Sequence, residues 1–184
     1  MKFIDPHHDL WHLAEGEDGP LVNPPARDHS LLTLEQWHAV RAHWLVGLNV
    51  GVLVPNDTDI DVLRDDLPRL SLVALNFPKW TDGRAYSQAR VLRARLRFAG
   101  EVRAKGEVLV DMLPLLQRTG FDAVQLRADQ RLDAAQRALR FFAGHYQGDT
   151  LEPRPAFARD LQADLLADEA RRRREAESLA GDGI

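Results

Sequence analysis

The segment from Phe77 to Ser87 concentrates residue types that can bind charged ligands. It reads Phe-Pro-Lys-Trp-Thr-Asp-Gly-Arg-Ala-Tyr-Ser and follows the apolar run 72–75. Its proline and its Asp-Gly pair are typical of turns, so this segment is predicted to be a loop that follows a strand. A lysine and an arginine in one loop can hold a phosphate, a sulfite-like oxyanion or a carboxylate. The candidate ligand- or partner-binding residues of the loop are Lys79, Trp80, Thr81, Asp82, Arg84 and Tyr86.

The same loop residues also have ordinary structural roles. Thr81 or Asp82 can cap the helix that follows. Trp80 and Tyr86 can pack against the core, and Lys79 can be a plain surface residue. Because the residue types alone do not choose between these roles, the binding and the structural interpretations both stay open.

Arg103 is a further candidate, and it comes from a predicted strand. It lies between two apolar residues, so its side chain points to one face of a strand that is otherwise expected to be buried. A buried arginine must be paired or must line a cleft. The structural alternative is a salt bridge to Glu101, Asp111 or Asp122. The functional alternative is that Arg103 lines a binding cleft beside the loop.

The order of elements predicts how these residues are positioned. Apolar runs alternate with helical patterns that end at glycines. The expected strands are 47–54, 71–76, 101–104 and 121–126, and the expected helices are 58–70, 85–98, 107–119 and 132–143. This alternation predicts an α/β fold with a mainly parallel sheet and helices on both faces. The alternative is an incomplete α/β barrel.

In either fold, ligands bind outside the carboxyl ends of the strands. The polar residues expected at that edge are Asn56, Asp57, Lys79 to Arg84, Lys105 to Glu107, Arg127 and Asp129. The long loop that contains Lys79 is expected to dominate this edge.

The flanking regions predict three parts of the chain. Residues 1–20 are expected to form an N-terminal arm or hairpin, residues 21–150 a single α/β domain, and residues 151–184 a charged C-terminal helical tail. Leu21 and Val22 are expected to open a first core strand. The capping box that begins at Thr33 predicts a helix as far as about Trp44, and the tail predicts a helix over 160–179.

Composition excludes several classes of function. The chain has 184 residues and a net charge of −4, which argues against a dedicated nucleic-acid binder. It has neither an apolar stretch of about 20 residues nor a secretory signal, so a cytoplasmic protein without a membrane partner is expected. Without cysteine, disulfides and thiolate catalysis are excluded. The spacing of its seven histidines predicts no metal site, and no cofactor motif is present, so the cofactor is unknown.

Basic residues gather between Lys79 and Lys105, where eight basic residues are opposed by only Asp82 and Glu101. Arg90, Arg93 and Arg97 fall at helical spacing, so a solvated helix face is one interpretation. The other is a docking face for an acidic partner.

The block from Phe77 to Arg90 resembles the hallmark of a bacterial family catalogued as domain of unknown function 934. The blocks Gly100–Ala104, Gly106–Leu109 and Gly120–Ala123 are similar as well, and the resemblance spans about Leu21 to Arg127. The family is often labelled a putative oxidoreductase, because its genes lie beside those for assimilatory sulfite reductase.

The resemblance implies an accessory protein or oxidoreductase of sulfite reduction, with sulfite reductase as its partner. The alternatives are an enzyme or sensor that binds a small oxyanion or phosphometabolite, and a structural interaction module. Two residues depart from the family pattern. Thr119 stands where a cysteine is common, which disfavours thiol redox chemistry. Lys105 stands where an apolar residue is expected, which weakens an essential role for it.

Overall fold

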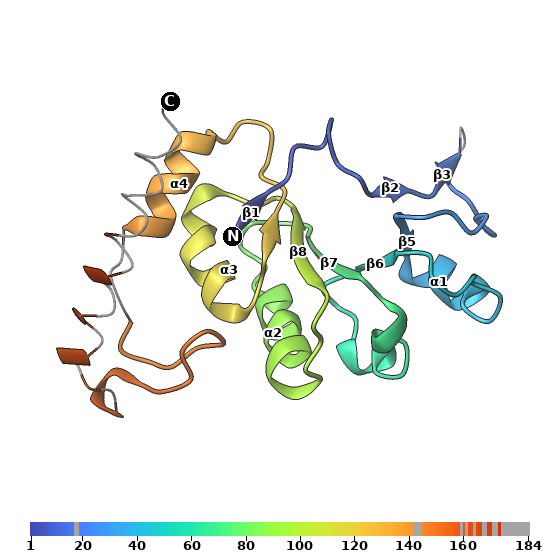
Figure 1. Cartoon of the computed structure of the whole chain (residues 1–184). Coiled ribbons are helices and arrows are strands. Elements are labelled where there is room, and N and C mark those ends of the chain that lie inside the picture. The colour runs from blue at the N-terminus through green and yellow to red at the C-terminus, as the bar shows by residue number, and fades with distance from the viewer. Residues whose placement is uncertain are drawn as a thin grey trace. The chain divides into compact units, whose positions relative to one another are not determined.

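The computed structural model describes residues 1–16, 19–141, 145–158, 160, 162–163, 165–166, 169–170 and 173. The chain divides into two compact units, Met1–Phe142 and Ala143–Ile184. The parallel sheet lies in the first unit (Figure 1). The second unit contains a short 3-10 turn, η5 Ala156–Ala158, and the predicted helix over 160–179 lies mostly outside the described residues.

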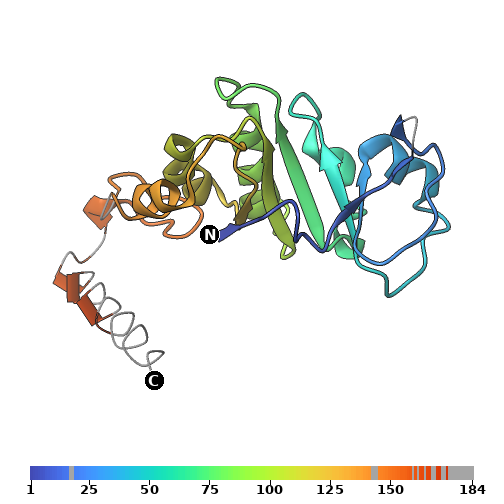
Figure 2. The same ribbon diagram turned by 90° about the horizontal axis from the view of Figure 1, so that it is seen from above.

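Seven parallel strands form one curled sheet in the order β1-β9-β8-β7-β6-β5-β2 (Figures 1 and 2). They are β1 Lys2–Phe3, β2 His12–Leu13, β5 Ser30–Thr33, β6 Val50–Val54, β7 Leu72–Phe77, β8 Glu101–Gly106 and β9 Ala123–Val124. Because β5 to β9 are neighbours in chain order, successive right-handed crossovers return on the same side of the sheet. The structure is therefore the incomplete barrel, with helices on the convex face in place of both faces.

The helices are shorter and more broken than the sequence predicted. They are α1 Leu34–Val40, α2 Arg84–Arg90, α3 Leu113–Thr119 and α4 Leu132–Arg140, with the 3-10 turns η1 Ile60–Leu63, η2 Leu67–Arg69 and η4 Val110–Met112 and the π-helical turn η3 Val91–Arg95. The expected helix 58–70 is thus two 3-10 turns. The physical reason is Pro68, which lacks the N–H needed to continue a helix from η1.

The start of the domain also differs from the prediction. Leu21 and Val22 are exposed and form no strand, and β5 is the first strand after the N-terminal arm instead. Pro24 and Pro25, which lack backbone donors, separate this segment from β5. The capping box is confirmed, because Thr33 Oγ1 accepts from Gln36 N at 3.2 Å while Thr33 N donates to Gln36 Oε1 at 2.8 Å. Helix α1 then ends at Val40 rather than Trp44.

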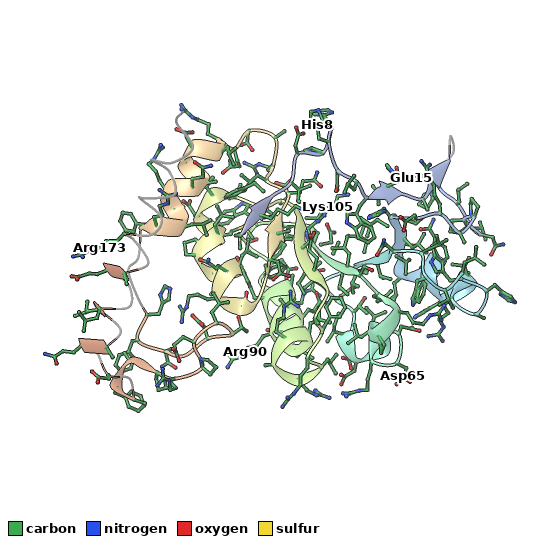
Figure 3. The ribbon with its side chains drawn as sticks, viewed as in Figure 1. His8, Glu15, Asp65, Arg90, Lys105 and Arg173 are labelled. Carbon is green, nitrogen blue, oxygen red and sulfur yellow. The ribbon has the colours of Figure 1, made fainter. Side chains whose placement is uncertain are left out.

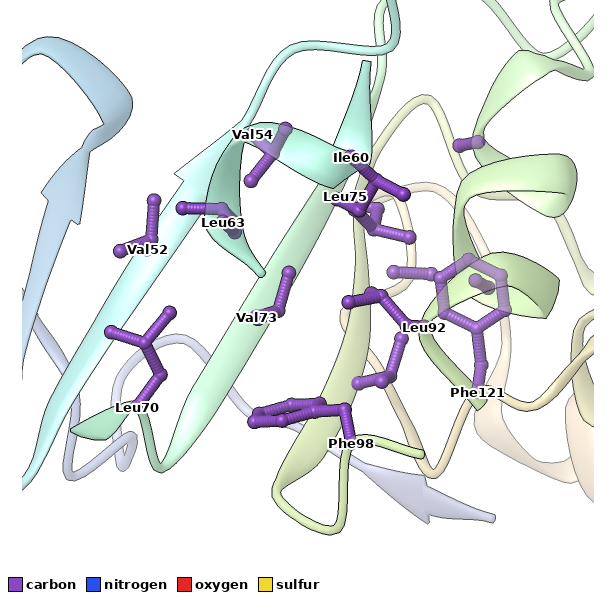
Figure 4. Packing of buried hydrophobic residues seen from close by; sticks show 14 of the residues in the cluster. Val52, Val54, Ile60, Leu63, Leu70, Val73, Leu75, Leu92, Phe98 and Phe121 are labelled. Atoms are coloured by element: carbon purple, nitrogen blue, oxygen red, sulfur yellow. The ribbon is translucent and has the colours of Figure 1, made fainter. Parts of the chain in front are cut away.

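The main core lies between the helices and the convex face of the sheet (Figure 4). Val52, Val73 and Leu75 point to this side, where they meet Leu63 and Leu92. Side chains alternate along a strand, so the residues between them point to the concave face. There a smaller cluster joins Leu31, Leu72 and Ala74 with Trp11 and Leu53.

The N-terminal arm covers part of the concave face. Strand β1 pairs with β9 at one edge of the sheet, and β2 pairs with β5 at the other. The segment between them, residues 4–11, therefore crosses from edge to edge (Figure 2). The arm then turns back in an antiparallel hairpin of β3 Glu15–Gly16 and β4 Gly19–Pro20. The buried Gln36 amide holds it in place by donating to Ala14 O and Leu21 O, each at 2.8 Å.

Candidate functional site

A pocket of about 840 Å³ opens on the concave face at the carboxyl ends of the strands. Its walls come from the arm, from β7 and β8, and from the segment that follows β9. The apolar part of the lining includes Phe3, Ile4, Leu13, Leu53, Leu126 and Leu132. Two smaller pockets of about 380 and 290 Å³ lie at the amino ends of the strands. Ligands of barrels and open parallel sheets bind at the carboxyl ends, so the 840 Å³ pocket is the candidate site.

Three polar side chains lie next to one another in this pocket. Asn76 of β7 is in register with Lys105 of β8. Gln125 follows β9, and its N–H donates to Ala104 O at 2.9 Å, which places it on the strand beside Lys105. All three line the pocket, and Figure 3 labels Lys105 near the upper end of β8. An amine thus lies between two amides that can donate or accept hydrogen bonds.

Lys105 is the unusual member of this group. Its side chain is half-buried, and no described carboxylate forms an ion pair with it. Burial lowers the pKa of the Lys105 amine, because desolvation disfavours the charged form. Asp9 and Glu15 partly oppose this pKa change and Arg103 adds to it. A negatively charged ligand would therefore stabilise the charged form of this amine more than that of an exposed lysine.

Gly106 allows a sharp turn and a close approach to β7 at the end of β8. Its φ of +99° lies in the left-handed region that favours glycine, and the chain turns there directly after Lys105. A Cβ at this position would lie 2.5 Å from Phe77 O and 2.8 Å from Asn76 Oδ1. Glycine therefore lets β7 and β8 approach closely beside Asn76.

The other charged side chains of the lining are Arg127 and Asp5. The guanidinium of Arg127 is held by Asp129 at 2.6 Å and Glu107 at 2.8 Å. Asp5 is the acidic residue in the lining, and its carboxylate accepts from the His7 backbone N–H. Since two carboxylates match Arg127 and Asp5 is exposed, the half-buried Lys105 is the cation of this lining that has no described ion-pair partner.

The loop predicted from the sequence follows β7, and none of its residues is among those lining this pocket. Arg84 donates from Nε and Nη2 to the two carboxylate oxygens of Asp82, at 3.0 and 2.7 Å. These hydrogen bonds hold the pKa of Asp82 well below its usual range. The structure therefore brings Asp82 and Arg84 together, and the positive charge of Arg84 is already matched.

The other loop residues separate into packed and exposed ones. Tyr86 packs edge-on against Phe77 and Phe121, with ring centroids 5.3 and 6.5 Å apart, and burial raises the pKa of its hydroxyl. Lys79 and Thr81 are exposed, and Trp80 is 57% exposed. Tyr86 thus has the structural role considered for it, while Lys79 and Trp80 present a cation and an indole to solvent.

Arg103 lies on the concave face, away from the surface. Its side chain is 1% exposed, and its described partners are Asp9, whose Oδ2 is 2.5 Å from Nη1, and Glu101, whose Oε1 is 2.8 Å from Nε. Nη2 is also 2.7 Å from Glu101 Oε1, outside hydrogen-bond geometry. Of the predicted salt-bridge partners, Glu101 is correct, while Asp9 was missed because it is distant in sequence.

The arginines of the basic segment do not share one solvated face. Arg93 is largely buried, forms an ion pair with Asp122, and donates to the carbonyls of Phe98, Gly100 and Gly120. Arg90 and Arg97 are exposed. Arg93 is therefore a structural residue that ties the end of the helical segment to the neighbouring loops.

Among the described residues, no group of three or more His, Asp or Glu side chains is arranged to hold a metal ion. Thr119, at the position where the family pattern suggests cysteine, donates its hydroxyl to Leu115 O and Leu116 O within α3. Within the described part of the chain, no helix has the length and apolar character needed to cross a membrane.

The sequence held one signal that points to the pocket. Glu101, Arg103 and Lys105 alternate with apolar residues, so all three share one face of β8. Because Arg103 points to the concave face, Lys105, two residues further along the strand, points there too. Asn76 and Gln125 were not found, because their meeting depends on the register between strands.

Comparison with known proteins identifies a family and nothing beyond it. Neither the curated proteins nor the solved structures contain a match to the chain. The family described as "Bacterial protein of unknown function (DUF934)" matches residues 51–157, which is more than half of the sequence. The matched region includes β6 to β9, the loop after β7, and the pocket residues Asn76, Lys105 and Gln125. The chain therefore belongs to the DUF934 family of bacterial proteins.

Proposed function

We propose that this protein binds a small anion in the concave pocket and serves assimilatory sulfite reduction in the cytoplasm. The observation that carries the binding proposal is the half-buried amine of Lys105, which has no described ion-pair partner and lines a pocket at the carboxyl ends of parallel strands. The link to sulfite reduction rests on the family resemblance. An anion-binding protein fits both, because sulfite and sulfate are themselves small anions.

Electrostatics explains why this pocket favours an anion. A partly buried ammonium has lost some of its stabilising contacts with water, and the negative charge of a ligand can compensate for that loss. Two opposite charges 4 Å apart attract by about 4 kcal/mol at the effective dielectric constant of a protein surface. Asn76 and Gln125 can then orient the ligand by hydrogen bonds, and the apolar wall around Leu53 and Leu126 can cover its remaining surface.

Anion binding is expected to raise the melting temperature, because a ligand that binds only the folded state stabilises it. We expect sulfite, sulfate or inorganic phosphate to produce this rise in differential scanning fluorimetry. Lys105→Gln is expected to remove it, since glutamine keeps the polar character and loses the charge. The matched control is Lys79→Gln, which removes the same charge from the exposed loop and should leave the rise unchanged.

Two results would contradict the assignment. If none of the three anions changes the melting temperature, the pocket does not bind small inorganic anions. If Lys79→Gln abolishes the rise while Lys105→Gln keeps it, the anion binds at the loop after β7 instead.

A second candidate function is docking to sulfite reductase through the loop after β7. The observation that favours it is the exposure of Trp80, a type of side chain that anchors protein interfaces, beside the exposed cation Lys79, which can orient an acidic partner. The pairing of Arg84 with Asp82 and the burial of Arg103 leave Lys79 as the main cation of this proposed contact.

Lys79→Glu is expected to reduce co-purification with sulfite reductase by about tenfold, the effect of losing about 1.4 kcal/mol of binding free energy. Arg140→Glu is the matched control, because it makes the same change in net charge at an exposed position of α4. Unchanged association of Lys79→Glu, together with normal growth on sulfate, would rule the loop out as the docking site.

A further inference from the structure

We propose that Lys105 is a nucleophile that condenses with the carbonyl group of an anionic substrate to form an imine. This inference rests on the proposed anion-binding function of the same pocket and deepens it. It names the substrate class, a small carbonyl compound that carries a negatively charged group. It also gives Lys105 a covalent role in addition to its electrostatic one.

Lysine is rare in this chain, which uses arginine for most of its positive charges. The sequence has 21 arginines and only three lysines, at positions 2, 79 and 105. Lys2 and Lys79 are exposed, and Lys105 alone is half-buried in the pocket. An arginine supplies a permanent charge but cannot lose its proton in a protein, whereas a desolvated lysine can. The pocket thus holds the cationic residue type that can also react as a neutral amine.

The Lys105 amine is partly removed from water and has charged neighbours on the same face of the sheet. A reactive lysine needs a low-dielectric site or a neighbouring cation, so that the neutral form is accessible near neutral pH. Burial lowers the Lys105 pKa, whereas the charges of Asp9 and Glu15 raise it and that of Arg103 lowers it. Desolvation is therefore the main cause of the lowered pKa. Asp9 forms its described ion pair with Arg103 and not with Lys105. No described carboxylate therefore holds the amine in its charged form through a direct ion pair.

The pocket around the Lys105 amine has room for a substrate and contains two side-chain amides. The 840 Å³ volume accommodates a small metabolite. The amides of Asn76 and Gln125 lie on the strands to either side of Lys105, where they can donate to a carbonyl oxygen. The imine formed on Lys105 carries a positive charge when protonated, so a negative charge on the substrate is matched once the imine has formed.

The proposed step is balanced without an oxidant or a reductant. The neutral amine attacks the carbonyl carbon, and the carbonyl oxygen takes up a proton to give a carbinolamine. Loss of the hydroxyl group as water, with the remaining N–H proton, forms the carbon–nitrogen double bond. The products are one imine and one water molecule, and hydrolysis reverses the step.

Reductive trapping tests this step directly. The full chain is incubated with pyruvate, or with pyridoxal phosphate as a second carbonyl anion, and then reduced with sodium borohydride. Peptide mass spectrometry measures modification at each lysine. We expect Lys105 to be modified at least about tenfold more than Lys2 and Lys79, which serve as exposed controls within the same molecule. Preference for pyruvate would indicate a 2-oxo acid, and preference for pyridoxal phosphate an aldehyde that carries a phosphate group.

The outcomes separate this inference from the function on which it rests. If sulfate or phosphate raises the melting temperature through Lys105 but neither probe is trapped there, anion binding stands and the imine proposal is wrong. Equal modification of all three lysines would also overturn it, because that is the reactivity of ordinary surface amines. Lys105→Arg, which keeps the charge but cannot form an imine, should abolish trapping.

Discussion

Asp9→Asn is expected to lower the free energy of unfolding by about 3 kcal/mol, because it removes one of the two carboxylates that neutralise the buried Arg103. Arg103 is 1% exposed, so its guanidinium has no access to water in compensation. The loss should also loosen the arm, whose residues 4–11 cross the concave face. Urea denaturation followed by circular dichroism measures the change.

Asp5→Asn is the matched control for this prediction. Asp5 lies on the same arm, but it is exposed, and its described contacts are with His7 and His8. Its replacement should change the free energy of unfolding far less than that of Asp9. Equal effects of the two substitutions would contradict the role assigned to the ion pair between Asp9 and Arg103.

Gly106→Ala is expected to destabilise the protein by about 3 kcal/mol and to weaken anion binding. A left-handed conformation costs a residue with a Cβ about 1–2 kcal/mol, and crowding of a packed region adds about 1–3 kcal/mol. At Gly106 both apply, because φ is +99° and the new Cβ would lie 2.5 Å from Phe77 O. Displacement of Asn76, 2.8 Å away, should disturb the pocket.

Gly47→Ala separates the two contributions. Gly47 has a φ of +94°, but a Cβ there would meet no atom within 4 Å. It should therefore show only the conformational cost, about 1–2 kcal/mol, with no effect on anion binding. If both glycine substitutions have the same effect in urea denaturation, the close approach of β7 and β8 at Gly106 does not matter for stability.

The parts of the fold that depend on local patterns were predictable. The capping box at Thr33 and the left-handed helix end at Gly120 are both set by residues close in sequence. The strands β6 and β7 appeared as apolar runs because a parallel strand that is covered on both faces is apolar throughout. Strand β8 instead alternates Glu101, Arg103 and Lys105 with small or apolar residues. The two-residue strands β1 and β2 carry no such pattern, and residues 1–20 were predicted only as an N-terminal arm or hairpin.

The site was only partly predictable, because it depends on which face of the sheet each side chain occupies. The carboxyl edge was correctly identified as a place for polar residues, and Lys105 was among them. The loop after β7 has more charged and aromatic residue types, but Asp82 pairs with Arg84 and Tyr86 packs against Phe77. These contacts and the register of Asn76 with Lys105 arise from three-dimensional proximity that one sequence does not encode locally.

The most direct test of the central claim is an NMR titration of the protein labelled with carbon-13 at the lysine ε positions. With only three lysines in the chain, Lys105→Gln identifies the Lys105 resonance. The structure predicts that this resonance titrates below the ordinary lysine pKa of 10.5 and shifts when pyruvate or sulfate is added, while those of Lys2 and Lys79 do not respond to the anion. A Lys105 resonance that titrates in the ordinary lysine range and is unmoved by either anion would contradict the account.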